Sequence, residues 1–189
     1  MERGSIQFRE KNMPATRDDL MAFLKELGIE VATTDHEPVF TVAESGDLHE
    51  RIPGGHTKNL FLKDKKGRLF LVVALHDADI DLKKIHQVIG AQGRVSFGNA
   101  DLLMEVLGVE PGSVTPFSLI NDRQDHRVTP VFDAAMMRHE ILNYHPLKND
   151  ATTSIAAEDL LKFAGACGHD AKVLPVSDGA KAAAAPDGQ

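Results

Sequence analysis

The feature that most constrains the fold is a pair of apolar runs joined by a short polar segment. The runs Asn59–Lys63 and Leu69–Leu75 flank Asp64–Arg68, which contains a glycine, and this arrangement predicts a β-hairpin. The second run is apolar at every position, a pattern typical of a strand that is buried on both faces. We therefore expect a central strand in a sheet that is covered on both sides.

Helical spacing of apolar side chains predicts several helices around this hairpin. Thr16, Asp81 and Asn99 are suitable N-cap residues, and Thr41 with Glu44 forms a capping-box pattern. The predicted helices cover residues 16–27, 41–49, 81–89, 99–107 and 156–166. Further short apolar runs predict strands at residues 29–33, 117–120, 128–132, 140–143 and 172–176.

The order of these elements indicates an α/β fold. The connections are too short and irregular for a regular alternation of parallel strands and helices, so we expect a mixed, largely antiparallel sheet flanked by helices. No linker interrupts residues 14–176, which should form a single domain. Residues 1–13 are polar and unpatterned, and residues 177–189 are alanine-rich and of low complexity, so we expect both ends to be loose tails.

Composition and charge exclude several classes of protein. Apolar residues make up 42% and charged residues 26% of the 189 positions, which is typical of a globular protein. The N-terminus lacks the apolar core of a secretory signal, and no apolar run approaches the roughly 20 residues that span a bilayer. A single cysteine, Cys167, rules out an internal disulfide, so we expect a cytoplasmic protein. The net charge of −7 argues against bulk, non-specific attraction to nucleic acid or anionic lipid, while a local basic patch stays open.

Familiar cofactor motifs are absent. His139 and His145 lack the four-residue spacing of a zinc-binding helix, and Lys58 is not preceded by the glycine pattern of a phosphate loop. The glycines near residue 90 do not have dinucleotide-binding spacing, and Cys167 lies in a stretch of small residues typical of a buried, inert thiol. We therefore expect no metal and no cofactor.

Four segments, taken in order, resemble the YbaK-like family of prolyl-tRNA editing domains. They are Pro38–Glu44, Thr57–Leu62, Gly112–Phe117, and His145–Leu147 followed by Asn149 and Thr152–Thr153. Each segment alone is a weak signal, but their order through residues 14–176 is specific. The resemblance implies a hydrolase that cleaves the ester of a mischarged tRNA(Pro), and it is strongest toward the free-standing alanyl editors.

The resemblance also assigns site residues. It implies catalytic roles for Lys58, whose ammonium group would hold phosphate or ribose oxygens, and for Gly112, whose backbone would approach the ester. The expected substrate-binding residues are Asn59, Ser113, Val114, Thr115, Pro116 and His145. Backbone amides of the Gly112–Pro116 loop could stabilise the oxyanion, and the vicinal hydroxyl of the terminal adenosine would help to activate water. His145 is then a pocket wall or a hydrogen-bonding group, and a purely structural histidine fits the sequence equally well.

Partners and alternatives follow from the same resemblance. The expected partner is mischarged tRNA(Pro), with prolyl-tRNA synthetase as a further candidate, and no membrane or DNA is expected. The lysine and arginine side chains of the predicted hairpin could lie beside the acceptor stem, or they could simply be exposed to solvent in a surface turn. Two alternatives stay open: a deacylase of the same family that acts on cysteinyl- or seryl-tRNA, and a non-catalytic module that binds tRNA or a synthetase.

Overall fold

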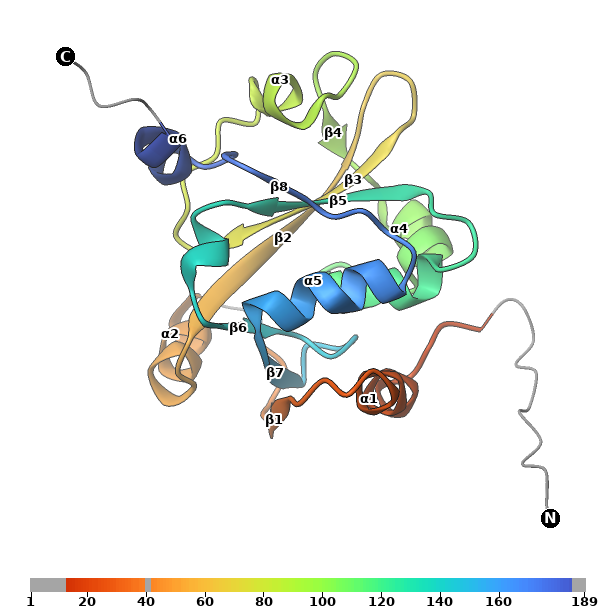
Figure 1. Cartoon of the computed structure of the whole chain (residues 1–189), viewed down its shortest axis with the longest axis vertical. Coiled ribbons are helices and arrows are strands. Elements are labelled where there is room, and N and C mark those ends of the chain that lie inside the picture. Colours follow the sequence, from red (N-terminus) through yellow and green to blue (C-terminus); the bar gives the residue numbers. More distant parts are fainter. Residues whose placement is uncertain (1–12, 40–41, 185–189) are drawn as a thin grey trace.

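The computed structural model describes residues 13–39 and 42–184 (Figure 1). Their centre is an eight-stranded mixed sheet with the strand order β1-β7-β6-β2-β3-β5-β8, to which β4 adds by pairing with β2. The strands are β1 (Ala32–Asp35), β2 (Gly55–Lys63), β3 (Leu69–Leu75), β4 (Ser96–Phe97), β5 (Val128–Asp133), β6 (Ile141–Tyr144), β7 (Ala151–Ala156) and β8 (Lys172–Leu174).

Helices cover both faces of this sheet. They are α1 (Arg17–Glu26), α2 (Val42–Arg51), α3 (Ile85–Ile89), α4 (Ala100–Leu107), α5 (Ala157–Ala166) and α6 (Asp178–Ala184), with 3-10 turns η1 (Pro116–Asp122) and η2 (Met136–Arg138). Figure 1 shows α1 and α5 on one side of the sheet and α3 and α6 on the other. The expected class, a single α/β domain with a mixed sheet flanked by helices, is confirmed.

The β2–β3 hairpin lies at the centre of the sheet, as the apolar runs predict. Its antiparallel register is continuous from Thr57 opposite Leu75 to Lys63 opposite Leu69. Parallel pairing of β6 with β2 and of β5 with β3 then extends the sheet in both directions.

Alternation along the hairpin separates two apolar cores, because successive side chains of a strand point to opposite faces. Phe61, Leu71 and Val73 pack in the larger core with α1, α4 and α5, whereas Leu62 and Phe70 pack in the smaller core with α3.

The predicted strand at residues 117–120 is wrong, because this segment forms η1. Pro116 fixes the backbone at the start of the turn and donates no hydrogen bond, which suits a helical first position. The Thr115 hydroxyl accepts from the Phe117 amide at 3.3 Å, and the Ser118 hydroxyl donates to the Thr115 carbonyl. Local capping therefore overrides the apolar pattern.

Other predicted boundaries differ by a few residues. The segment 81–89 becomes helical only at Ile85, because Asp81 instead accepts the Lys83 amide in a preceding turn. Strand β7 was not predicted, since its threonines and serine give it no apolar run. Helix α2 is described from Val42, so the predicted capping residue Thr41 lies outside the described residues.

The C-terminal segment differs from the prediction of a loose tail after residue 176. Asp133 is fully buried and accepts hydrogen bonds from the Val176 and Ser177 amides at 3.1 Å each and from the Ser177 hydroxyl at 2.6 Å. The Ser177 hydroxyl accepts the Ala180 amide in turn, which starts α6. One buried carboxylate thus fastens residues 176–180 to the sheet, while residues 1–12 and 185–189 lie outside the described residues.

Replacing Asp133 with alanine should release this segment. The variant loses the acceptor for three hydrogen bonds, so we expect faster amide hydrogen exchange at residues 176–180 and a loss of about 1–3 kcal/mol in the free energy of unfolding. Ser177→Ala, which removes one of the three bonds together with the cap, should have a smaller effect. Unchanged exchange at these amides in Asp133→Ala would show that the carboxylate does not anchor α6.

Candidate functional site

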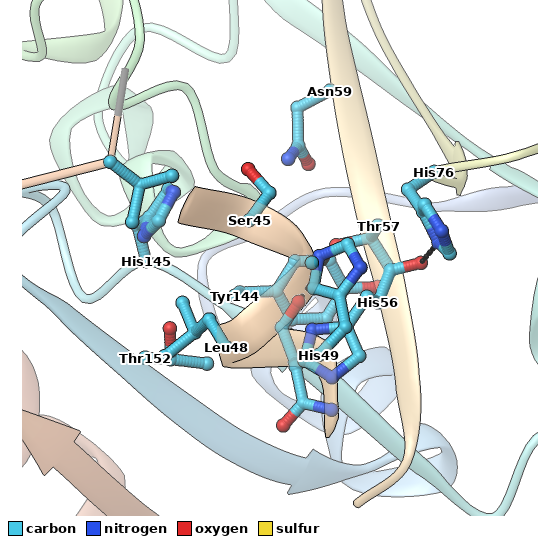
Figure 2. A pocket seen from close by; sticks show the side chains of 13 residues that line it. Ser45, Leu48, His49, His56, Thr57, Asn59, His76, Tyr144, His145 and Thr152 are labelled. Atoms are coloured by element: carbon cyan, nitrogen blue, oxygen red, sulfur yellow. Dashed lines mark hydrogen bonds between the residues drawn. The ribbon is translucent and has the colours of Figure 1, made fainter. Parts of the chain in front are cut away.

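A cavity of about 480 Å³ lies between α2, the first half of β2 and the ends of β6 and β7 (Figure 2). It is lined by Val39, Ser45, Gly46, Leu48, His49, His56, Thr57, Asn59, His76, Asn143, Tyr144, His145 and Thr152. Two of the predicted site residues, Asn59 and His145, are therefore brought together from positions far apart in the sequence. Figure 2 shows Asn59 on β2 and His145 on the segment that follows β6.

Strand β2 supplies one wall through alternate residues. Thr57 and Asn59 both face the cavity, and the Thr57 hydroxyl donates to the Asn143 carbonyl at 2.7 Å, which ties β2 to β6. The side-chain oxygen of Asn59 is buried, and no described residue gives it a hydrogen bond. A buried acceptor without a donor costs about 1–3 kcal/mol, so this atom is prepared to accept a hydrogen bond from a ligand.

Lys58 lies on the opposite face of the sheet from Thr57 and Asn59, because the register of β2 is continuous there. Its ammonium group donates to the Ala78 carbonyl, two residues beyond His76, and it is not among the residues that line the cavity. Lys58 therefore holds the segment that follows β3. Its expected catalytic role stays a prediction.

The Gly112–Pro116 loop lies behind the cavity wall. Gly112 has a positive φ of 89°, as the predicted glycine turn requires. Ser113, Thr115 and Pro116 are buried and Val114 packs against the larger core, and none of the five residues lines the cavity. The Phe117 ring next to the loop packs edge-on against Tyr144, with ring centroids 5.9 Å apart, so the loop supports a residue of the wall. Its role toward substrate stays a prediction.

His145 has a defined tautomer. Its Nδ1 lies 3.0 Å from the Ala151 carbonyl oxygen. Because a carbonyl oxygen only accepts, Nδ1 must carry the proton, and Nε2 keeps its lone pair in the neutral ring. Burial lowers the pKa of His145 below its ordinary value of 6.5, an effect that the hydrogen bond to Ala151 opposes and the nearby His36 reinforces. His145 is therefore a neutral proton acceptor at pH 7.

Three further histidines form one side of the cavity. The rings of His49 and His56 stack with centroids 4.0 Å apart, and the His76 ring meets His49 edge-on at 4.4 Å. Burial, with the neighbouring His56 and His76, lowers the pKa of His49 from 6.5 to about 4. Burial also lowers the pKa of His56, whose Nε2 lies 2.7 Å from the Ile52 carbonyl oxygen.

This histidine cluster does not have the geometry of a metal site. Stacked rings cannot direct two nitrogen lone pairs at one ion, and the Ile52 carbonyl occupies one nitrogen of His56. Within residues 13–39 and 42–184, no group of three His, Cys, Asp or Glu side chains is arranged to hold a metal ion. The cluster forms an aromatic wall in which the lowered pKa values of His49 and His56 favour their neutral rings.

His49 and His76 line the cavity but were not predicted as site residues. The predicted hairpin could have indicated His76: its register pairs Thr57 with Leu75, so His56 and His76 come next to each other. The alternation of side chains along β2 could likewise have indicated that Thr57 and Asn59 share a face. His49 reaches the cluster only through the packing of α2 against the sheet, which no local pattern in the sequence encodes.

Titration of His49 tests this environment. The folded protein should keep the His49 ring neutral until the pH falls to about 4. The unfolded chain takes up its proton near 6.5, so the His49 term should make the protein less stable as the pH falls from 6.5 toward 4. Proton NMR of the imidazole resonances measures the midpoint directly, and a His49 midpoint at 6.5 would contradict the stacked, buried arrangement.

Comparisons with known proteins agree with this fold. The family model described as "Aminoacyl-tRNA editing domain" matches residues 36–163. The chain belongs to the aminoacyl-tRNA editing domain family. The match spans Asn59 and His145 and most of the sheet.

Relatives of this editing domain include the mouse "Prolyl-tRNA synthetase associated domain-containing protein 1", which is 38% identical over 162 residues that cover 84% of this chain and 95% of the mouse protein. The "Prolyl-tRNA editing protein ProX" of Acetoanaerobium sticklandii is 36% identical over 156 residues, covering 82% of this chain and 94% of ProX.

A solved structure described as "a putative trans-editing enzyme for prolyl tRNA synthetase" has the same fold. It matches with a TM-score of 0.63 at 15% identity and covers 84% of this chain and 95% of the other. The YbaK-like resemblance is thereby confirmed. No helix in the described part of the editing domain is long and apolar enough to cross a bilayer.

Proposed function

We propose that this editing domain is an aminoacyl-tRNA deacylase that hydrolyses Ala-tRNA(Pro) in trans, in the cytoplasm and beside prolyl-tRNA synthetase. The observation that carries the proposal is the cavity in which the unpartnered oxygen of Asn59 and the neutral imidazole of His145 come together. This combination offers one acceptor for the substrate's amino group and one acceptor for a proton.

Asn59 accounts for recognition of the aminoacyl group. An aminoacyl ester carries a free α-ammonium group, which donates hydrogen bonds and accepts none. Because Asn59 Oδ1 is buried without a donor, a bond from this ammonium group satisfies an atom that is otherwise unpaired. Hydrogen bonds to charged groups contribute about 1.5–3 kcal/mol, so this single contact can orient the ester.

His145 accounts for activation of water. A water molecule adds to the ester carbonyl carbon while Nε2 of His145 takes up its proton, directly or through the vicinal hydroxyl of the terminal ribose. The tetrahedral intermediate then collapses, the bond to the ribose oxygen breaks, and His145 returns the proton to that oxygen. The products are the free amino acid and uncharged tRNA.

The Gly112–Pro116 loop and Lys58 enter the proposal as supporting groups. Phe117, next to the loop, packs on Tyr144 in the cavity wall, so we propose that the loop supports this wall and that a backbone amide of the loop reaches a bound ester only after the loop moves. Lys58 fixes the chain beyond His76 through Ala78. We propose that the Lys58 ammonium group can contact the substrate only after its hydrogen bond to the Ala78 carbonyl opens.

Alanine is the proposed amino acid because the family includes editors that separate small side chains from proline by size. Each methylene group changes the binding free energy by only about 1–3 kcal/mol, which is too little for a synthetase site to reject a smaller amino acid fully. A second site that admits alanine but excludes the larger proline supplies the missing discrimination. Serine and cysteine are close to alanine in size, so seryl- and cysteinyl-tRNA are the alternative substrates. The name ProX supports a prolyl-tRNA context.

Deacylation of tRNA(Pro) charged with alanine, serine, cysteine or proline tests the proposal. We expect rapid hydrolysis of the alanyl ester and little of the prolyl ester. Asn59→Ala should slow the reaction roughly 10- to 100-fold, because it removes a hydrogen bond to a charged group. Asn59→Asp keeps the acceptor and should retain more activity. Binding of tRNA without hydrolysis of any ester would instead identify a non-catalytic module.

The pH dependence of single-turnover deacylation tests His145. Since the pKa of His145 lies below 6.5, the rate should be insensitive to this group at neutral pH and should fall once the pH drops below that lowered pKa. His145→Ala should remove this acidic limb and lower the plateau by about 10²-fold or more. A wild-type limb that persists unchanged in His145→Ala would assign the titration to another group.

Lys58→Ala separates chemistry from structure. If the ammonium group acts on the substrate, the variant should lose most of its deacylation rate while its thermal midpoint changes little. Lys58→Arg keeps the charge and is the matched control. A loss of stability that accounts for the loss of rate would assign Lys58 to holding the Ala78 segment.

A further inference from the structure

Five basic side chains gather at the end of the β2–β3 hairpin, away from the cavity. They are Lys63, Lys65, Lys66, Arg68 and Arg94, all of them exposed, and we call them the basic tip. Lys63 is brought beside the 90–97 segment by the pairing of β2 with β4. A positive cluster of this kind is unexpected on a chain with a net charge of −7.

The acidic residue within the tip does not cancel this charge at the surface. Asp64 is buried and accepts from the amides of Lys66, Arg68 and Gln92 and from the Arg68 side chain, each at 2.9 Å. Burial alone would raise the pKa of Asp64, but these hydrogen bonds outweigh it and lower the pKa to about 2. Its carboxylate organises the turn from inside.

Only one of the five exposed cations has a carboxylate partner in the described part of the chain. Lys63, Lys65, Lys66 and Arg94 form no ion pair there, and Arg68 pairs with the buried Asp64 alone. Solvent-exposed cations that are held together without anions attract a polyanion strongly. Their positive field is therefore available to a ligand.

The tip is also rigid before any ligand arrives. The Lys65 amide donates to the Gln92 carbonyl at 3.2 Å, and the Gln92 amide donates to Asp64 at 2.9 Å, so the two loops are joined. The stem of Lys65 packs against Gly93, where a side chain would come within 2.8 Å of it. A preset arrangement lowers the entropy cost of binding.

The spacing from the cavity suits a nucleic acid. A strand rises about 3.3 Å per residue, so Asn59 and Lys63, which ends β2 at the tip, are about 13 Å apart. Along the axis of a duplex, the phosphates of one strand advance by about 3.4 Å per nucleotide, so this distance corresponds to a few nucleotides. A tRNA whose 3′ end enters the cavity would therefore bring the phosphates of its acceptor duplex near the tip.

We propose that the basic tip is a docking surface for the phosphate backbone of the acceptor-stem RNA duplex, while the single-stranded 3′ end occupies the cavity. The placement of the 3′ end rests on the proposed function. The phosphate contacts give affinity and position the duplex without reading its sequence, because phosphates are the same in every base pair.

Fluorescence anisotropy with two uncharged RNAs tests this surface: a hairpin with the acceptor duplex and its 3′ single strand, and the 3′ single strand alone. Lys65→Ala/Lys66→Ala should weaken hairpin binding about 5- to 30-fold and reduce the slope of log K against log salt by about 2, since each lost phosphate contact removes about 0.9. Binding of the single strand should not change. Lys25→Ala/Lys162→Ala, which removes two exposed lysines from α1 and α5, is the matched control.

The outcomes separate this inference from the proposed function. Hairpin affinity and salt slope that are unchanged in Lys65→Ala/Lys66→Ala, or equally reduced in the control, would overturn the docking surface whatever the catalytic activity. Loss of hairpin binding supports it even if no aminoacyl ester is hydrolysed, in which case the deacylase proposal alone fails. With an alanyl ester of adenosine as substrate, which has no duplex, the tip variant should react at the wild-type rate.

Discussion

The continuous register of the β2–β3 hairpin is the constraint on which the rest of the structure depends. Because every residue from Thr57 to Lys63 pairs without interruption, alternation turns Thr57 and Asn59 to the face of the larger core and Lys58 to the other face. The cavity lies at the end of the strand, where His56 also lines it. A slip of one residue would exchange these faces and would also turn Phe61 out of the larger core. The two apolar cores therefore hold the register, and the register places the site.

The surrounding fold sets the hydrogen-bonding and protonation states of the polar groups in the cavity. Asn59 keeps a buried oxygen unpaired, and burial lowers the pKa values of His145 and His49 because it disfavours their protonated forms. The unpaired oxygen costs stability at any pH, whereas the lowered pKa of His49 costs stability only below about pH 6.5. The unpaired Asn59 oxygen and the His145 ring lie in the same cavity, and this is the physical basis for proposing the chemistry there.

The sequence predicted the fold more completely than the site. Apolar runs and capping residues identified the hairpin, α1, α4 and α5, because these signals are local. They failed at η1, where Thr115 and Pro116 favour a turn over the strand that the apolar residues suggest, and at residues 177–184, where Asp133 anchors an alanine-rich segment from a distant strand. Asn59 and His145 came from a family resemblance, which carries residue identity but not which face of a strand each residue occupies.

The most direct test of the account is where an aminoacyl end binds. A non-hydrolysable analogue, adenosine joined to alanine through a 3′-amide, can be titrated into labelled protein while NMR follows the Asn59 side-chain amide and the His145 ring. We predict that both shift with a common dissociation constant and that the Lys58 side chain and the Ala78 amide shift little. Shifts centred on Lys58 and Ala78, with Asn59 and His145 unaffected, would contradict the account.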